Sequence, residues 1–376
     1  MPGVEVVAGG PADVVEVGHL VLRGTHREIG RSLAEVAQDR HGVAPAAGGD
    51  PAVTRARRHW YEREWPAHFQ RMLGVADVHG LAVDDDAVEL GLLAYLGAPP
   101  GCSVAWLPPE VVASGHPTLS RNYDFPAATL TEILGGVAQP GELAMTARPY
   151  VTETYPADGG RACLFIGAYE LLGGCLDGVN DAGLVVAMLA DDEPGGAGPT
   201  LAPAAGLNEI QVLRYLLETC TTTGEARAGL RAAQQYVMFQ ACHYLVADAT
   251  GDSFVWESGR HVVEGAGEVQ VVTNHLLHGR PSLEDLPAGD GPSATYARAR
   301  RLTAAVAARA GPMSTDEIKA AHACVDRTDA GPVAPRTLWH GIYDAADRSL
   351  DVSFHLGDAV GGAGARRSPY RHFRLG

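Results

Sequence analysis

The sequence predicts an α+β protein whose helices and strands are stacked in layers. Two observations lead to this class. The first hundred residues of the 376-residue chain carry mainly helical patterns, whereas the remainder is dominated by short β-like runs separated by Gly, Asp and Asn. In that remainder the helical patterns are grouped between sets of strands and do not alternate with single strands, which argues against a doubly wound parallel sheet.

The N-terminal hundred residues are expected to form one strand followed by helices. A β-like run at 14–22 leads into a helical pattern at 26–40, where apolar residues recur three or four positions apart. A second helical pattern lies at 60–73 and a third at 84–96. The third pattern stops at the Ala-Pro-Pro-Gly sequence of 98–101, which cannot continue a helix.

Short apolar runs beyond Cys102 predict strands. They lie at 162–167, 183–189, 243–248, 252–257, 268–273, 337–343 and 349–355. Two helical patterns interrupt them. One lies at 208–220 and is followed by a Thr-x-x-Glu capping box, Thr222 to Glu225, for the next helix, and the other extends from Thr315 to Val325.

Composition and charge exclude several classes of function. Acidic residues outnumber basic ones 45 to 29, and a surface with a net charge of −16 repels the phosphates of nucleic acids. The longest apolar runs, such as 184–189, fall far short of the roughly 20 residues that span a bilayer. The chain opens without a basic segment before an apolar one, so we expect no secretory signal and a cytoplasmic protein.

Cofactor and metal chemistry find no support in the sequence. No GxGxxG motif joins a strand to a helix and no GxxxxGK[ST] motif occurs, so no dinucleotide or P-loop cofactor is expected. The 6 cysteines include no CxxC pair, which argues against a disulfide framework and a zinc ribbon. His243 and His275 lack an HExxH pattern and are interpreted as core histidines, so no metal is expected either.

The junction between the two halves of the chain holds its most informative pair of residues, Gly101 and Cys102. Cleavage of the bond between them would give Cys102 a free α-amino group beside its own thiol. The amine titrates at about 7.7–8.0 and the thiol at about 8.5, so the amine could take the thiol proton near neutral pH. One residue would then supply both nucleophile and base. Taken alone, a Gly-Cys pair also fits a small buried cysteine.

Polar residues at predicted strand ends and turns extend this candidate site. Arg121 and Asp124 form an Arg-Asn-x-Asp pattern at the end of a strand, and Asn274 closes an apolar strand, where a buried amide needs a partner. Asn180 lies in Leu-Asp-Gly-Val-Asn-Asp-Ala-Gly-Leu at 176–184, before a buried strand. Arg121 and Asp124 also fit a simple ion pair, and Asn180 fits a turn equally well.

The order and spacing of these sequence segments resemble those of the N-terminal-nucleophile (Ntn) hydrolases. The resemblance is to the choloylglycine hydrolase and penicillin acyltransferase type, the linear-amide C–N hydrolases. The resemblance is closest to the acyl-coenzyme A:6-aminopenicillanic acid acyltransferase branch. It rests on residues 24–30, 121–125, 180–184, 243–248, 273–275 and 336–339. It implies a four-layer αββα sandwich, with 1–101 as a largely helical propeptide or α-chain and 102–376 as the catalytic β-chain.

The resemblance implies roles at the nucleophile. Cys102 matches the nucleophile itself, and Arg121 matches an arginine that favours the thiolate by placing a positive charge beside it. Asp124 matches the acid that holds the new α-amine.

The resemblance also implies an oxyanion hole, the group of donors that binds the negatively charged oxygen of the intermediate. Asn274 matches its side-chain amide donor and Asn180 the position that completes it, since such donors stabilise charge that develops only in the tetrahedral intermediate. Arg298 matches the late arginine of the family, with Arg300 and Arg301 as alternatives in the alignment.

The expected activity is cleavage of a linear amide through a Cys102 thioester, by an enzyme that cuts its own chain before Cys102. An acyltransferase that moves the acyl group from an amide or thioester to an amine would use the same residues, so that alternative stays open. A binding protein of the same fold without catalysis is a third interpretation. The expected partner is a small acyl-amide or acyl-thioester, with no nucleic acid and no membrane. The substrate, the processing of the chain and homo-oligomer formation stay open.

Overall fold

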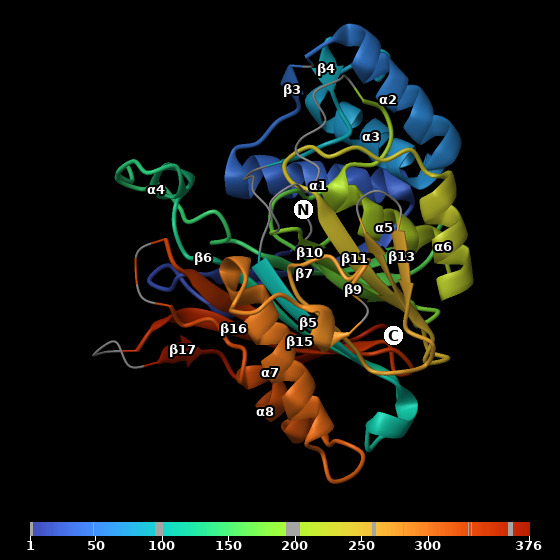
Figure 1. Cartoon of the computed structure of the whole chain (residues 1–376). Coiled ribbons are helices and arrows are strands. Elements are labelled where there is room, and N and C mark those ends of the chain that lie inside the picture. The colour runs from blue at the N-terminus through green and yellow to red at the C-terminus, as the bar shows by residue number, and fades with distance from the viewer. Residues whose placement is uncertain are drawn as a thin grey trace.

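In the computed structural model, two β-sheets lie face to face between two layers of helices (Figure 1). The structure describes residues 3–47, 49–94, 101–192, 204–257, 261–280, 282–329, 331, 333–359 and 364–376. This four-layer arrangement confirms the predicted α+β class and the αββα sandwich that the resemblance implies.

The first sheet is antiparallel except for its β2–β7 pair, which is parallel. Within the described residues its nine strands follow the order β1-β2-β7-β8-β9-β10-β11-β12-β13. Their bounds are, in that order, Glu5–Gly9, Glu16–Gly24, Tyr150–Pro156, Cys163–Gly167, Asp177–Asn180, Val185–Ala190, Cys242–Ala247, Ser253–Glu257 and His261–Glu264. The helices that cover its outer side are α1 (His26–His41), α5 (Glu209–Thr219) and α6 (Thr223–Ala232). Helix α3 (Pro66–His79) packs against α1, and α2 (Pro51–Glu64) packs against α3.

The second sheet is antiparallel in every described pair. Its order is β14-β5-β6-β15-β16-β17, and β18 also pairs with β16. The bounds are Gln270–Val272, Gly101–Leu107, Thr118–Pro126, Pro335–Asp344, Ser349–Asp358, Ala365–Arg367 and, for β18, Arg371–Arg374. Helices α7 (Thr295–Ala307) and α8 (Thr315–Ala323) cover its outer face (Figure 1). Short elements complete the chain: β3 (Ala46–Ala47), β4 (Val88–Glu89), α4 (Leu130–Ile133) and the 3₁₀ turns Pro109–Val111, Leu283–Asp285 and Pro292–Ala294.

Strand alternation places Cys102 between the two sheets. Side chains along a strand point to opposite faces in turn. Cys102 belongs with Val104 and Trp106 to the large core that fills the space between the sheets, whereas Ala105 and Leu107 belong to the smaller core beneath α7 and α8. The thiol therefore points into the centre of the sandwich.

The N-terminal segment is built into the same sandwich. Strands β1 and β2 extend the first sheet, where β2 pairs with β7. On the helical side, Glu218 of α5 accepts from Arg71 (2.8 Å), from Arg214 (2.5 Å) and from the indole N–H of Trp65 (2.8 Å), all buried. The contacts of Arg71 and Trp65 with Glu218 and the pairing of β2 with β7 cross residue 101. Separation of the segment would therefore expose charged groups as well as apolar surface. The domain boundary at residue 101 stays a prediction.

Each of the strands predicted beyond Cys102 overlaps an observed strand, from β8 to β16. The helical patterns at 26–40, 208–220 and 315–325 are likewise confirmed by α1, α5 and α8. The predicted capping box is only half present. Thr222 accepts from the backbone N–H of Glu225, but the Glu225 carboxylate binds Thr221.

Three predictions for the N-terminal segment are wrong. The helix expected at 84–96 is replaced, over 84–94, by turns and β4, because three successive aspartates favour turns; residues 95–96 lie outside the described residues. The helical pattern at 60–73 is divided between α2 and α3 at Trp65, since Pro66 lacks the N–H that a continuous helix needs. Two strands, β1 and β2, stand where one was expected.

Helix α7 had no counterpart among the predicted elements. Ser293 and Ala294, which precede it, have φ of 48° and 54°, and no side chain caps its first turn. The usual start signal of a helix is therefore absent from the sequence.

Candidate active site

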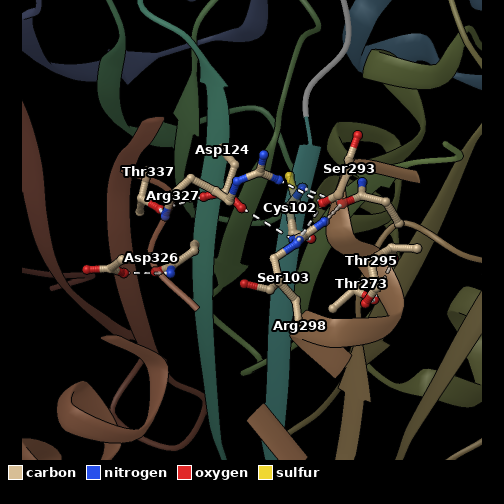
Figure 2. A network of polar contacts seen from close by, with 12 residues as sticks. Cys102, Ser103, Asp124, Thr273, Ser293, Thr295, Arg298, Asp326, Arg327 and Thr337 are labelled. Atoms are coloured by element: carbon tan, nitrogen blue, oxygen red, sulfur yellow. Dashed lines mark hydrogen bonds and ion pairs between the residues drawn. The ribbon is translucent and has the colours of Figure 1, made fainter. Parts of the chain in front are cut away.

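Cys102 lies at the beginning of β5, with its side chain fully buried (Figure 2). Its backbone N–H donates a hydrogen bond to Oδ1 of Asn274 (2.8 Å). Strand β5 pairs with β6 on one side and with β14 on the other. Polar residues of β6, and those that directly follow β14, therefore converge on Cys102.

Arg121 of β6 lies beside the thiol. Its Nη2 is 3.1 Å from Sγ of Cys102 and also donates to the carbonyl oxygen of Met188 (2.7 Å). Its Nη1 donates to the carbonyl oxygen of Leu176 (2.5 Å) and forms a buried ion pair with Asp177. These contacts hold the guanidinium in one orientation against the sulfur.

The charge of Arg121 opposes the effect of burial on the thiol. Burial raises the pKa of Cys102 above its usual value, because a thiolate between the sheets would lose its hydration. Arg121 acts in the opposite direction by its charge and its hydrogen bond. For Arg121, burial alone would lower the pKa of the guanidinium. Cys102 and Asp177 instead hold that pKa above its usual value, so Arg121 stays charged.

Asp124 ends the polar stretch of β6 and lies opposite Gly101 in the β5–β6 ladder. Its Oδ1 accepts from Oγ1 of Thr337 (2.6 Å), and its Oδ2 is 3.4 Å from Nη1 of Arg298. Burial raises the pKa of Asp124, and Arg298 and Thr337 counter that rise. The carboxylate therefore stands, oriented from two sides, next to the residue that precedes Cys102.

Of the three late arginines that the resemblance left as alternatives, Arg298 reaches Cys102. Its Nη1 donates to the carbonyl oxygen of Cys102 (2.6 Å) and its Nη2 to Oδ1 of Asn274 (2.6 Å). Figure 2 shows the Arg298 side chain extending from α7 towards Cys102. Arg300 instead donates to the carbonyl oxygens of Pro287 and Gly289 in a loop, and Arg301 is exposed. The geometry thus separates the three arginines that the sequence left as alternatives.

Asn274 contacts Cys102 through its amide oxygen. Oδ1 accepts from both Cys102 and Arg298, whereas Nδ2 donates to the carbonyl oxygen of Ala190 (2.8 Å). An amide nitrogen carries two hydrogens, so one N–H of Asn274 remains beyond this bond. In the described contacts of Asn274, that second hydrogen has no acceptor.

The structure does not bring Asn180 to the thiol. Its Nδ2 donates to the carbonyl oxygens of Leu217 (2.9 Å) and Cys220 (2.7 Å), and its Oδ1 accepts from the N–H groups of Ala182 and Leu184 (3.0 Å each). None of its described contacts involves Cys102. The geometry agrees with the turn interpretation of Asn180, because its side chain binds the end of α5 and the turn that follows β9.

Two residues near the site were missed in the sequence. Asp177, which binds Arg121, also accepts from the hydroxyl of Tyr343 and lies 3.4 Å from the indole nitrogen of Trp339. It belongs to the same motif as Asn180 but lies three positions earlier, so strand alternation directs it to the opposite face, a signal that was available. Thr337, far along the chain in a bulged part of β15, had no such signal.

The histidines considered as metal ligands are hydrogen-bonded in the core. His243 faces the Asp191 carboxylate and the carbonyl oxygen of Thr273, and Nδ1 of His275 is 3.0 Å from Oγ1 of Thr273. Within the described ranges, a group with metal-ligand atoms close together is His116, Asp344 and Asp347, near the surface. There His116 and Asp344 bind one another (2.8 Å) and Arg374 binds Asp347, so these atoms already have partners.

Among the helices in the described ranges, none combines the length and the hydrophobicity of a membrane-spanning segment. No curated protein matches the chain. Among solved structures, similarity extends to penicillin V acylase from Agrobacterium tumefaciens, with 17% identity, a TM-score of 0.45 and coverage of 67% of this chain and 83% of the acylase. A mutant of conjugated bile acid hydrolase from Clostridium perfringens matches with 14% identity, a TM-score of 0.45 and coverage of 73% of this chain and 97% of the hydrolase.

The model of one protein family matches residues 112–358, and its description is acyl-coenzyme A:6-aminopenicillanic acid acyl-transferase. The matched range includes Arg121, Asp124, Asn274 and Arg298 but begins after Cys102. Because it spans more than half of the chain, this protein belongs to the acyl-coenzyme A:6-aminopenicillanic acid acyl-transferase family.

Proposed function

We propose that this chain is a self-processing cysteine amidohydrolase that cleaves a linear amide through a thioester on Cys102. The observation that carries the proposal is the set of groups around one buried cysteine. Arg121 lies 3.1 Å from its sulfur, Asn274 accepts from its N–H at 2.8 Å, and Arg298 donates to its carbonyl oxygen at 2.6 Å. A buried residue of purely structural role would not need two charged groups and an amide.

The first chemical step follows cleavage between Gly101 and Cys102. The new α-amine takes the proton of the Cys102 thiol, and the thiolate sulfur attacks the carbonyl carbon of the substrate amide. A C–S bond forms and the carbonyl oxygen becomes negative. The remaining N–H of Asn274 stabilises that oxygen, and Arg121 stabilises the thiolate before the attack.

The second step breaks the C–N bond. The amine leaves with the proton held by the α-ammonium group, and the acyl group remains on sulfur as a thioester. Water then attacks the thioester, the α-amine takes its proton, and the acid leaves as the thiol is restored. Asp124, oriented by Thr337 and Arg298, holds the α-amine in place for both proton transfers.

Transfer of the acyl group to an amine is the second candidate, favoured by the description of the family model. The thioester forms in the same way, but an amine nitrogen replaces water as the attacking atom and a new amide results. The outcome depends on whether an amine acceptor fits the site and water is kept out.

The test is a panel of acyl-amides and acyl-thioesters, incubated with the purified protein in the presence and absence of amine acceptors. We expect turnover by the wild type, no turnover by Cys102→Ala, and full turnover by Cys324→Ala, whose thiol is exposed. A new amide among the products identifies transfer, and a free acid identifies hydrolysis. Turnover that survives Cys102→Ala would refute the proposal.

A further inference from the structure

Most charged groups around Cys102 are balanced by a partner. Arg121 pairs with Asp177, and Arg298 lies 3.4 Å from Asp124. These two pairs leave no net charge beside the thiol. Any further charged group at the site therefore has to find its partner elsewhere.

Asp192 is such a group. It follows β10, and its backbone N–H donates to the carbonyl oxygen of Asn274 (2.9 Å), so it is attached to the residue that contacts Cys102. Asp192 as a whole is half-buried, but its Oδ2 is covered and has no hydrogen-bond partner. No ion pair involves Asp192 among the residues that the structure describes. An uncompensated buried carboxylate oxygen is costly and calls for an explanation.

Arg298, whose charge acts on Asp192, does not fill this role. Each nitrogen of the Arg298 side chain already has an acceptor: the carbonyl oxygens of Ser293 and Cys102, Asp124, and Oδ1 of Asn274. Burial raises the pKa of Asp192. Hydrogen bonds with the side chains of Ser293 and Gln240 and the charges of Arg298 and His243 oppose this rise only in part. The carboxylate therefore remains without a dedicated counter-charge.

The backbone on this side of the site is strained. Ser293 has φ of 48° and the next residue has 54°, a left-handed region that side chains other than glycine rarely adopt. The carbonyl oxygen of Ser293 accepts from Nη1 of Arg327 (2.7 Å) and Nε of Arg298 (3.3 Å), which hold the strained turn in place. Figure 2 shows Ser293 and Asp124 on opposite sides of Cys102. Strain of this kind is concentrated at functional sites.

We propose that Asp192 binds an ammonium group of the substrate beside the reacting carbonyl. The preferred substrates are then acyl compounds that carry a protonated amino group on the acyl half or on the amine half. An ammonium supplies both the missing positive charge and N–H donors for Oδ2. The inference rests on the proposed function and concerns the processed enzyme, because the Cys102 thiol and Oδ2 of Asp192 are both covered in the uncut chain.

The experiment compares matched amides with the processed enzyme. One set carries an ammonium on the acyl half, a second carries it on the amine half, and a third has a neutral group of the same size. We expect kcat/KM to favour one ammonium set over the neutral set by about tenfold or more, the usual effect of one hydrogen bond to a charged group. The set that is favoured identifies the half that Asp192 binds.

The variants test whether Asp192 causes this preference. Asp192→Asn should bring the ratio of ammonium to neutral substrate close to one, and Asp192→Lys should reverse it towards carboxylate-bearing substrates. Asp316→Asn, which removes an exposed carboxylate of α8, should keep the wild-type ratio. Asp192→Ser replaces the Asn variant if thermal melting shows that the latter does not fold.

The outcomes separate the two proposals. Cys102-dependent turnover with the same ratio in the wild type and in Asp192→Asn would overturn the role of Asp192 and leave the amidohydrolase intact. Absence of turnover on every amide and thioester, or turnover that survives Cys102→Ala, would instead overturn the proposed function.

Discussion

Replacement of Arg121 by Ala should shift the pH profile of Cys102 reactivity upwards. Its Nη2 lies 3.1 Å from the sulfur, where a cation and a thiolate attract by about 5 kcal/mol at an effective dielectric constant near 20. Asp177 cancels part of this attraction. A residual shift of about 1–3 pKa units is what one adjacent charge commonly produces. Loss of Arg121 should therefore raise the thiol pKa and slow alkylation at pH 7 about 10- to 1000-fold.

The assay is the rate of iodoacetamide inactivation of the processed enzyme as a function of pH. Below the thiol pKa this rate rises tenfold per pH unit, so the Arg121→Ala curve should be displaced to higher pH with the same plateau. Arg300→Ala is the matched control, since that side chain binds only loop carbonyl oxygens in its described contacts. Superimposable curves for the wild type and Arg121→Ala would show that this arginine does not tune the nucleophile.

Three further variants test other parts of the site and its support. Asn274→Ala should lower kcat by about 10² to 10³ and leave alkylation of processed Cys102 nearly unchanged, and full activity would remove it from the oxyanion hole. Thr337→Val removes a donor that lowers the pKa of Asp124, so the acidic limb of kcat/KM should move to higher pH and Thr337→Ser should restore it. Glu218→Gln leaves Arg71 and Arg214 without their buried counter-charge and should cost about 3–5 kcal/mol in urea unfolding. Although burial would raise the pKa of Glu218, the two arginines hold it far below its usual value, so this contribution should be complete at neutral pH and lost only as the solution becomes strongly acidic.

The strands expected beyond Cys102 were predictable because each is a short apolar run between turn formers. Strands β7 and β18 were not among the predictions, because polar residues interrupt their sequences. The layered arrangement followed from their grouping with the helices. The N-terminal segment was harder, because apolar residues in 84–96 have helical spacing although the preceding aspartates favour turns. Helix α7 was missed because two residues of left-handed conformation precede it and no side chain caps its first turn.

The candidate site was predictable where a residue type and a strand end coincide. Cys102, Arg121, Asp124 and Asn274 all stand at such places, and the structure brings them together with Arg298. The position of Asn180 could not be predicted from the sequence, because an asparagine in a turn and an asparagine in an oxyanion hole give the same sequence pattern. Partners such as Thr337 and Asp192 depend on packing between distant strands, which a single sequence does not reveal.

In the proposed mechanism, cleavage of the chain makes Cys102 an N-terminal nucleophile. Intact-mass measurement of the purified wild type tests it most directly. We expect two fragments that stay together in native chromatography, residues 1–101 and 102–376, roughly 11 and 29 kDa by their share of the 39.4 kDa chain. The larger fragment should begin with Cys102-Ser103-Val104, and Cys102→Ala should remain a single chain. An active wild-type protein that keeps its uncut 39.4 kDa chain would show that Cys102 does not act as an N-terminal nucleophile.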